Sequence, residues 1–212
     1  MKIKGIYLLL MAFFFLAACS EDTENSVSAA ESAKEAPAYY EGYVKNPQVT
    51  DDRKLHEEGQ SIRDGRGELM LNRVNMKNET HKIGDIELTV QEAKLFHYTP
   101  DHSMVDFFHS YTHETDFDMV KLFVEVKNTS DEPLHFAPIA LLQTSEEELK
   151  LWEDDVYLEE LNGEIKAGES KKGNLGFIVE NPEIDSFIIT TSDVFNGNNE
   201  KLEDAQKVEV KF

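Results

Sequence analysis

The chain has 212 residues, of which 21 are basic and 42 acidic, and it contains a single cysteine. A formal net charge of -21 disfavours nucleic acid and bare anionic lipid as partners, because both are bound through basic patches. One cysteine allows no disulfide within the chain, so the fold must depend on its own hydrophobic core. The acidic surface favours solubility and leaves open a preference for basic partners or bound cations.

The N-terminal residues have the pattern of a secretory signal peptide. Lys2 and Lys4 precede an apolar run, Ile6–Leu16, and two alanines follow it. The apolar stretch is shorter than the roughly twenty residues that cross a bilayer as a helix. The order Leu-Ala-Ala-Cys at residues 16–19 resembles the lipobox of bacterial lipoproteins. The resemblance implies that residues 1–18 are removed and that Cys19 carries lipid, which anchors the protein to the outer side of the cell membrane.

The segment behind Cys19 is expected to be a tether. Ser20–Ala38 is rich in Ser, Glu, Ala and Asn, and it has too few large apolar side chains to offset the entropy of ordering, which predicts disorder. Residues 39–67 form a partly ordered lead-in, in which three tyrosines are expected to pack on the domain or the cell wall. A short helix is predicted over Asp51–Arg63.

From Glu68 onward, apolar and polar residues alternate with the period of two that a half-buried strand requires. Turn sequences rich in Asn, Gly and Pro separate these short segments. The pattern predicts a mainly β fold, an antiparallel β-sandwich over residues 68–212. Strands are expected at Leu69–Val74, Ile86–Val90, Val120–Val126, Ile139–Leu142, Leu149–Trp152, Leu175–Val179, Phe187–Thr191 and Val208–Phe212. Asp154–Leu161 is expected to form a single helical turn between the sheets.

Several of these motifs occur in a familiar order. Ile83-Gly84 leads into a strand, Leu122–Ser130 is followed by a turn with Pro133, and residues 166–179 contain Lys-Ala-Gly-Glu and Gly-Asn-Leu-Gly-Phe-Ile-Val. This order resembles the immunoglobulin-like extracellular lipoprotein domains of Gram-positive bacteria, a family largely of unknown function that is related in fold to a mycobacterial secreted antigen. The resemblance covers about Thr80–Phe212 and implies an immunoglobulin-like sandwich, but it supplies no catalytic residue.

The segment between Leu95 and Val120 departs from the simplest members of that family and is expected to be an elaborated loop. It contains four of the seven histidines, mixed with carboxylates: His97, His102, His109 and His113. Imidazole groups with a carboxylate suit zinc or copper, although this spacing matches no established metal motif. The interleaved aromatic residues favour instead a loop that packs partly on the domain with its histidines exposed, and pH sensing is a further alternative.

A second concentration of charge surrounds the only tryptophan. Acidic residues at 146–148 and 153–160 flank Trp152, but the regular Asp, Asn and Gly positions of a calcium loop are absent. We therefore expect a solvated acidic face, with Trp152 in the sandwich core and an exposed binding role as the alternative.

The sequence contains none of the common hydrolase motifs, such as Gly-x-Ser-x-Gly, Ser-x-x-Lys or His-Glu-x-x-His, and no phosphate-binding glycine loop. It therefore favours a non-catalytic, membrane-anchored lipoprotein that binds or supports an envelope protein or cell-wall partner, without a cofactor. Two alternatives remain open: an extracytoplasmic zinc- or copper-binding lipoprotein that uses residues 97–116, and an envelope enzyme with an unrecognised site.

Overall fold

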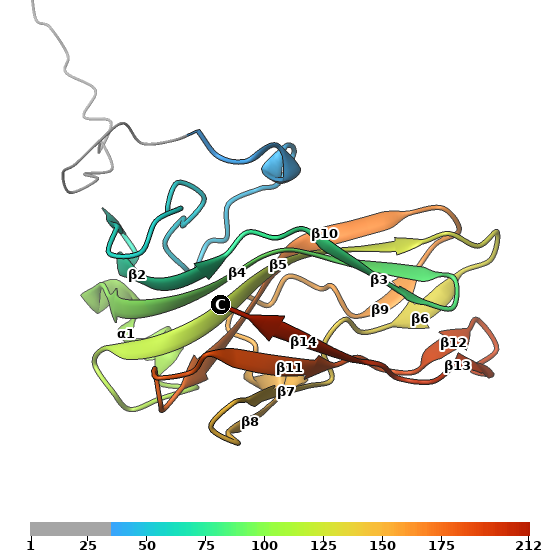
Figure 1. Ribbon diagram of the computed structural model, residues 1–212. Helices are drawn as coiled ribbons and strands as arrows, with labels where there is room; N and C mark the ends of the chain where they lie inside the picture. Colours follow the sequence, from blue (N-terminus) through green and yellow to red (C-terminus); the bar gives the residue numbers. More distant parts are fainter. Residues whose placement is uncertain (1–34) are drawn as a thin grey trace, which may run out of the picture.

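The computed structural model describes residues 35–212 (Figure 1). The predicted signal peptide, Cys19 and most of the predicted tether lie outside the described residues. The described part is mainly antiparallel β-structure, which confirms the predicted fold class. Its few helical segments are one or two turns long, and none of those between residues 35 and 212 has the length and apolar composition to span a bilayer. They are the 3-10 helices Ala38–Tyr40, His102–Met104 and Trp152–Asp154 and the helix α1, Val105–Phe108.

The large sheet has six strands in the order β1-β2-β4-β5-β10, with β3 also paired to β4. The long strand β4 pairs with β2 along its C-terminal part and with β3 along its N-terminal part, so that β2 and β3 share one side of it. The six strands are β1 (Ser61–Asp64), β2 (Gly67–Asn75), β3 (Glu79–Ile83), β4 (Ile86–Pro100), β5 (Phe117–Asn128) and β10 (Ser170–Val179).

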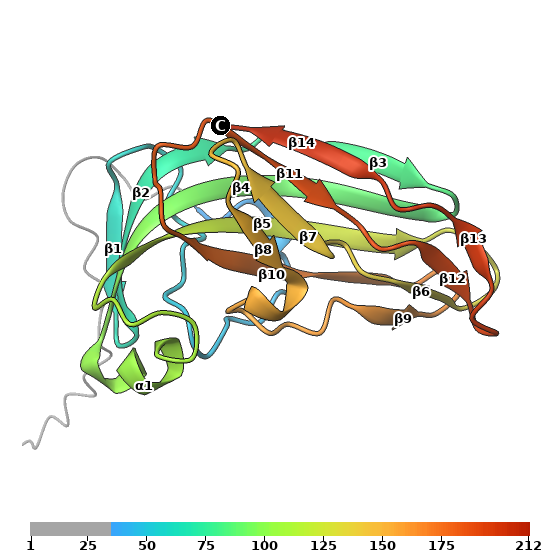
Figure 2. The same cartoon turned by 90° about the horizontal axis from the view of Figure 1, so that it is seen from below.

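Two four-stranded sheets, with the orders β14-β11-β7-β8 and β13-β12-β6-β9, form the second layer (Figure 2). The main hydrophobic core lies between the layers, where Leu122 and Val124 of β5 and Phe187 and Ile189 of β11 are buried. The strands of this layer are β6 (Leu134–Phe136), β7 (Leu141–Thr144), β8 (Leu149–Leu151), β9 (Gly163–Ile165), β11 (Ser186–Thr190), β12 (Val194–Asn196), β13 (Lys201–Glu203) and β14 (Lys207–Lys211).

A β-bulge at Gln91 changes which residues of β4 face the main core. The pairing register with β5 shifts between Val90 and Glu92. Before the bulge Val90 faces the main core, and after it Ala93 does so. Because side chains alternate along a strand, the extra residue turns Glu92 and Lys94 to the outer face of the large sheet.

The lead-in lies over this outer face (Figure 1, blue) and closes a second hydrophobic cluster there. Phe96 and Met119 of the sheet pack with Val49 and Leu55 of the lead-in, and all four are buried. The three tyrosines pack on the domain, which is one of the two arrangements predicted for them. The ring centroid of Tyr40, for example, lies 4.2 Å from that of Phe123. The part of the outer face beneath the lead-in is thus buried, and the chain before Glu68 contributes to the folded body.

The predicted helix over Asp51–Arg63 is wrong. This segment consists of turns followed by β1, in which Ile62 pairs with Leu69 of β2. Local helix propensity is overridden because Asp52 turns toward buried lysines and Ile62 joins the sheet.

Two further expectations need correction. The loop expected between Leu95 and Val120 is present but shorter, since β4 continues to Pro100 and β5 begins at Phe117; residues 101–116 lie outside the strands and contain only a 3-10 helix and α1. The helical turn expected over residues 154–161 occurs earlier, at Trp152–Asp154. The strands expected at Ile139–Leu142 and Leu149–Trp152 occur at residues 141–144 and 149–151, where β7 and β8 pair as a hairpin.

Gly176 of β10 offers a test of packing on the outer face. A Cβ at this position would lie 2.6 Å from Cε2 of the buried Tyr157 and 3.2 Å from Sδ of Met119. We expect Gly176→Ala to lower the free energy of unfolding by about 1–3 kcal/mol through overpacking, measured by urea denaturation. Gly197→Ala is the control, because a Cβ there meets no atom within 4 Å. Equal stability of the two variants would contradict the packing described.

Candidate functional site

Four charged side chains are buried together beneath the lead-in, and we call Asp52, Glu92, Lys94 and Lys121 the buried ion cluster. None has a side chain more than 4% exposed. The Lys94 ammonium lies 2.8 Å from Asp52 Oδ2 and 2.9 Å from Glu92 Oε1. The Lys121 ammonium lies 3.0 Å and 2.6 Å from the same two oxygens. Two positive and two negative charges therefore neutralise one another away from water.

Two tyrosines of the lead-in complete the cluster. The Tyr40 hydroxyl donates to Glu92 Oε1 at 2.6 Å and accepts from Lys121 Nζ at 2.6 Å, while the Tyr39 hydroxyl donates to Glu92 Oε2. Burial alone would raise the pKa of Glu92, but the ammonium groups of Lys121 and Lys94 outweigh burial and hold that pKa well below its usual range. Burial alone would lower the pKa of Lys121, but Asp52 and Glu92 raise it. A lysine held protonated in this way is a poor base or nucleophile. Because Asp52 and the two tyrosines come from the lead-in and the other charged groups come from the sheet, the cluster fastens the lead-in to the sheet.

A third buried carboxylate holds the segment behind the exposed Trp152. Asp155 Oδ1 accepts from the backbone N–H groups of Tyr157 and Gly176 at 3.1 Å and 2.8 Å, and Oδ2 accepts from that of Leu158 at 3.2 Å. Burial raises the pKa of Asp155 to about 6, against the opposing effect of these three donors. Asp155 thus links the turn at 155–158 to β10.

The surface beside this turn contains a hollow of about 520 Å³, which we call the Trp152 groove. Trp152 is 52% exposed and Leu158 is 56% exposed, whereas Leu161 and Leu175 are buried at its floor. The prediction that Trp152 fills the sandwich core is therefore wrong. Trp152 directly follows the edge strand β8, and the main core is formed by other side chains. The remaining lining residues are Glu153, Asp155, Glu159, Glu160 and Asn162.

The wall of the Trp152 groove has an uncommon backbone. Leu158 has φ of +56° and Glu160 has φ of +49°, in the left-handed region that residues other than glycine rarely adopt. Glu159 between them faces the lead-in: its Oε1 accepts from Asn46 Nδ2 at 2.8 Å and from the Tyr43 hydroxyl, and its Oε2 accepts from Asn174 N at 2.7 Å. These contacts fix the turn in a conformation that leaves the apolar side chain of Leu158 exposed to solvent.

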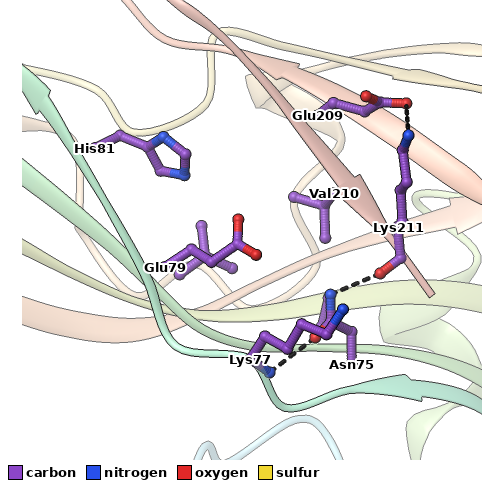
Figure 3. Close-up of a pocket in the computed structure, with 9 residues that line it drawn as sticks. Asn75, Lys77, Glu79, His81, Glu209, Val210 and Lys211 are labelled. Atoms are coloured by element: carbon purple, nitrogen blue, oxygen red, sulfur yellow. Dashed lines mark hydrogen bonds and ion pairs between the residues drawn. The ribbon is translucent and has the colours of Figure 1, made fainter.

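A separate pocket of about 240 Å³ opens between the edge strands β3 and β14 (Figure 3). Its charged side chains are of both signs, and Lys211 Nζ lies 3.3 Å from Glu209 Oε1 on the same strand, β14. Asn75 Nδ2 donates to the carbonyl of Lys211 at 2.6 Å. Figure 3 shows His81 of β3 on the opposite side from Glu209. Because its charged groups include an internal ion pair, this pocket offers a ligand less uncompensated charge than the Trp152 groove does.

The structure does not gather the four predicted metal ligands at one point. His97 lies at the end of β4, with Nδ1 3.3 Å from Asp118 Oδ1 and Nε2 3.5 Å from Asp116 Oδ1. The rings of His109 and His113 are 6.2 Å apart between centroids, and His102 is exposed in a 3-10 helix. Among residues 35–212, no three His, Cys, Asp or Glu side chains are arranged to hold a metal ion. The zinc or copper site stays a prediction.

Sequence reasoning missed the buried ion cluster and undervalued the Trp152 groove. Lys121 occupies a polar position in an alternating strand, which usually indicates a solvent-facing side chain. The one available signal was Gln91-Glu92, two polar residues in succession within a strand pattern, which is typical of a bulge. For Trp152, the exposed alternative was considered and is the arrangement observed.

Comparison with known proteins finds a relative that matches over its full length. The chain is 43% identical over 235 residues to the uncharacterized protein YdhF of Bacillus subtilis, and the match covers 99% of this chain and 100% of YdhF. No family model matches the chain.

Solved structures give more distant likenesses. A functionally unknown protein from Listeria monocytogenes has a TM-score of 0.46 and 13% identity, with 69% of this chain and 87% of that chain covered. A putative lipoprotein from Bacillus subtilis, ycdA, has a TM-score of 0.39 and 19% identity, with 65% of this chain and 39% of that chain covered.

We expect Lys121→Met to lower the free energy of unfolding by about 3–5 kcal/mol, because it leaves two buried carboxylates to share one ammonium. Urea denaturation measures the loss, and limited trypsin digestion should show earlier cleavage within the lead-in. Lys82→Met removes a surface pair with Glu87 instead and should change stability by less than about 1 kcal/mol. Equal effects of the two variants would contradict the role of the cluster.

Asp155 should make stability fall as the pH rises. Burial raises the pKa of Asp155 from its ordinary value of 3.8 to about 6, so the folded state binds the proton more tightly than the unfolded state does. The free energy of unfolding should therefore decrease between about pH 4 and 6, by up to about 2–3 kcal/mol from this residue. Urea denaturation of Asp155→Asn across this range should show a flatter pH dependence than the wild type. The exposed control Asp131→Asn should keep the wild-type slope, and an unchanged slope in Asp155→Asn would refute the assignment.

Proposed function

This chain belongs to the same family as the uncharacterized protein YdhF of Bacillus subtilis, and we propose that it is a lipid-anchored binding module on the outer side of the cell membrane. In this role the β-sandwich is a non-catalytic platform, and the Trp152 groove contacts a partner in the cell envelope.

The anchor is the lipid on Cys19. A single acyl chain gives only marginal membrane binding, whereas a diacylated cysteine supplies two chains and holds stably. In this proposal Ser20–Ala38 serves as the tether, and a flexible chain of that length would have a mean reach of roughly 25 Å. Tyr39 and Tyr40 follow this segment directly and bind the buried ion cluster. The tether would therefore join the body at a fixed point on the outer face of the large sheet.

The observation that carries the binding role is the exposed apolar surface at the Trp152 groove. Trp152 and Leu158 remain more than half exposed in a chain that is otherwise strongly acidic. Leu149 and Leu151 of the neighbouring strand β8 are more than half exposed as well. Contiguous exposed apolar side chains with a polar rim are typical of sites for protein–protein interaction. Leu158 is also kept there by a backbone conformation that costs free energy.

The anchor and the binding role can be tested together on intact cells. We expect wild-type protein to remain in the membrane fraction and Cys19→Ser to appear uncleaved or released, because it cannot be lipidated. A photoreactive amino acid in place of Trp152 should yield a discrete crosslinked band, whereas the same substitution at Leu202, equally exposed on β13, should not. Membrane retention of Cys19→Ser equal to wild type would contradict the anchor. Identical crosslinking patterns at the two positions would contradict the binding role.

A further inference from the structure

We propose that the Trp152 groove binds an extended peptide segment in which one apolar side chain is flanked by basic residues. This inference rests on the proposed function, since it names the chemistry of the partner at the same site. Its support comes from the floor of the groove, the charges at its rim and the conformation of its wall.

The floor and walls suit one apolar side chain. Leu161 and Leu175 are buried at the base, and the ring of Trp152 and the side chain of Leu158 stand beside them with about half of their surface in water. A volume of about 520 Å³ lies within the range of natural ligand sites. An inserted side chain of leucine size would cover apolar surface of Trp152 and Leu158, which gives roughly 25 cal/mol for each Å² removed from water.

The rim attracts positive charge. Glu153 and Glu160 are exposed, and neither carboxylate has an ion-pair partner in the described part of the chain. The nearby Lys171 donates to the backbone carbonyls of Glu160 and Asn162, at 3.2 Å and 3.3 Å, and so does not occupy these carboxylates. Lysine or arginine side chains on each side of the inserted residue would pair with Glu153 and Glu160. The face of Trp152 is a further site for a cation.

The wall is held ready for such a ligand. Asp155 accepts from the backbone N–H of Leu158, and Glu159 binds the lead-in and β10 on either side of the turn. These contacts maintain two left-handed residues, each of which costs on the order of 1–3 kcal/mol. A groove fixed before binding loses less entropy when the ligand docks.

The only tryptophan of the chain reports directly on this site, so a peptide without tryptophan can be titrated by intrinsic fluorescence. The probe is the blocked pentapeptide Gly-Lys-Leu-Lys-Gly, with Gly-Glu-Leu-Glu-Gly and Gly-Lys-Ser-Lys-Gly as matched controls. We expect a saturable change in Trp152 emission with the first peptide, at least tenfold weaker binding of the other two, and weaker binding at higher salt.

Variants separate the two parts of the proposal. Glu153→Gln with Glu160→Gln should weaken binding of the basic peptide at least threefold and reduce its salt dependence. Glu132→Gln with Glu183→Gln, two exposed positions outside the groove, should leave both unchanged. Leu158→Ala retains the fluorescent reporter and should weaken binding at least threefold through the lost apolar wall.

No saturable change at roughly 1 mM basic peptide, or equal binding of the acidic peptide, would overturn the proposed chemistry. A discrete crosslink at position 152 on cells without peptide binding would leave the binding module standing and refute the basic, apolar ligand. Peptide binding in vitro without any specific crosslink on cells would support the groove chemistry and count against the envelope role.

Discussion

The buried ion cluster is the constraint on which the arrangement of this protein depends. An ionised side chain loses several kcal/mol of hydration when it is buried, so Glu92, Lys94 and Lys121 cannot remain dry unless each meets an opposite charge. The second carboxylate, Asp52, comes from the lead-in. Docking of the lead-in and burial of the part of the outer face beneath it are therefore one event. The bulge at Gln91 belongs to the same event, because without it Glu92 would point into the main core.

The sequence predicts the strands and their inner faces, but it does not reveal what covers their outer faces. The alternation in β5 predicts its strand and its inner face correctly, because Val120, Leu122 and Val124 face the main core. The same alternation assigns Lys121 to solvent, because a period of two does not reveal whether a second layer covers the other face. The helix predicted near Asp52 failed for a related reason, since the partners of Asp52 are distant in sequence. The prediction for Trp152 was wrong in the opposite direction. The size of its side chain favours burial, but Trp152 directly follows the edge strand β8 and is exposed.

The lead-in also connects the buried ion cluster to the Trp152 groove. Tyr43 and Asn46 follow the tyrosines that bind Glu92, and both donate to Glu159 in the wall of the groove. The second oxygen of Glu159 accepts from Asn174 on β10. A variant that releases the lead-in would thus remove hydrogen bonds that hold the left-handed residues on either side of Glu159. A substitution in the buried ion cluster could therefore weaken ligand binding by releasing the lead-in, without changing any residue of the groove itself.

This connection has a consequence for the proposed role at the membrane. The tether would enter the body at the lead-in, and the same lead-in contacts Glu159 in the wall of the groove. The outer face of an anionic membrane concentrates basic segments within about a Debye length and repels a body with a net charge of -21. Basic segments near the membrane would therefore be enriched close to an acid-rimmed groove, while the body itself would be held away from lipid. Charge and attachment then favour the same class of partner, a basic segment presented near the membrane surface.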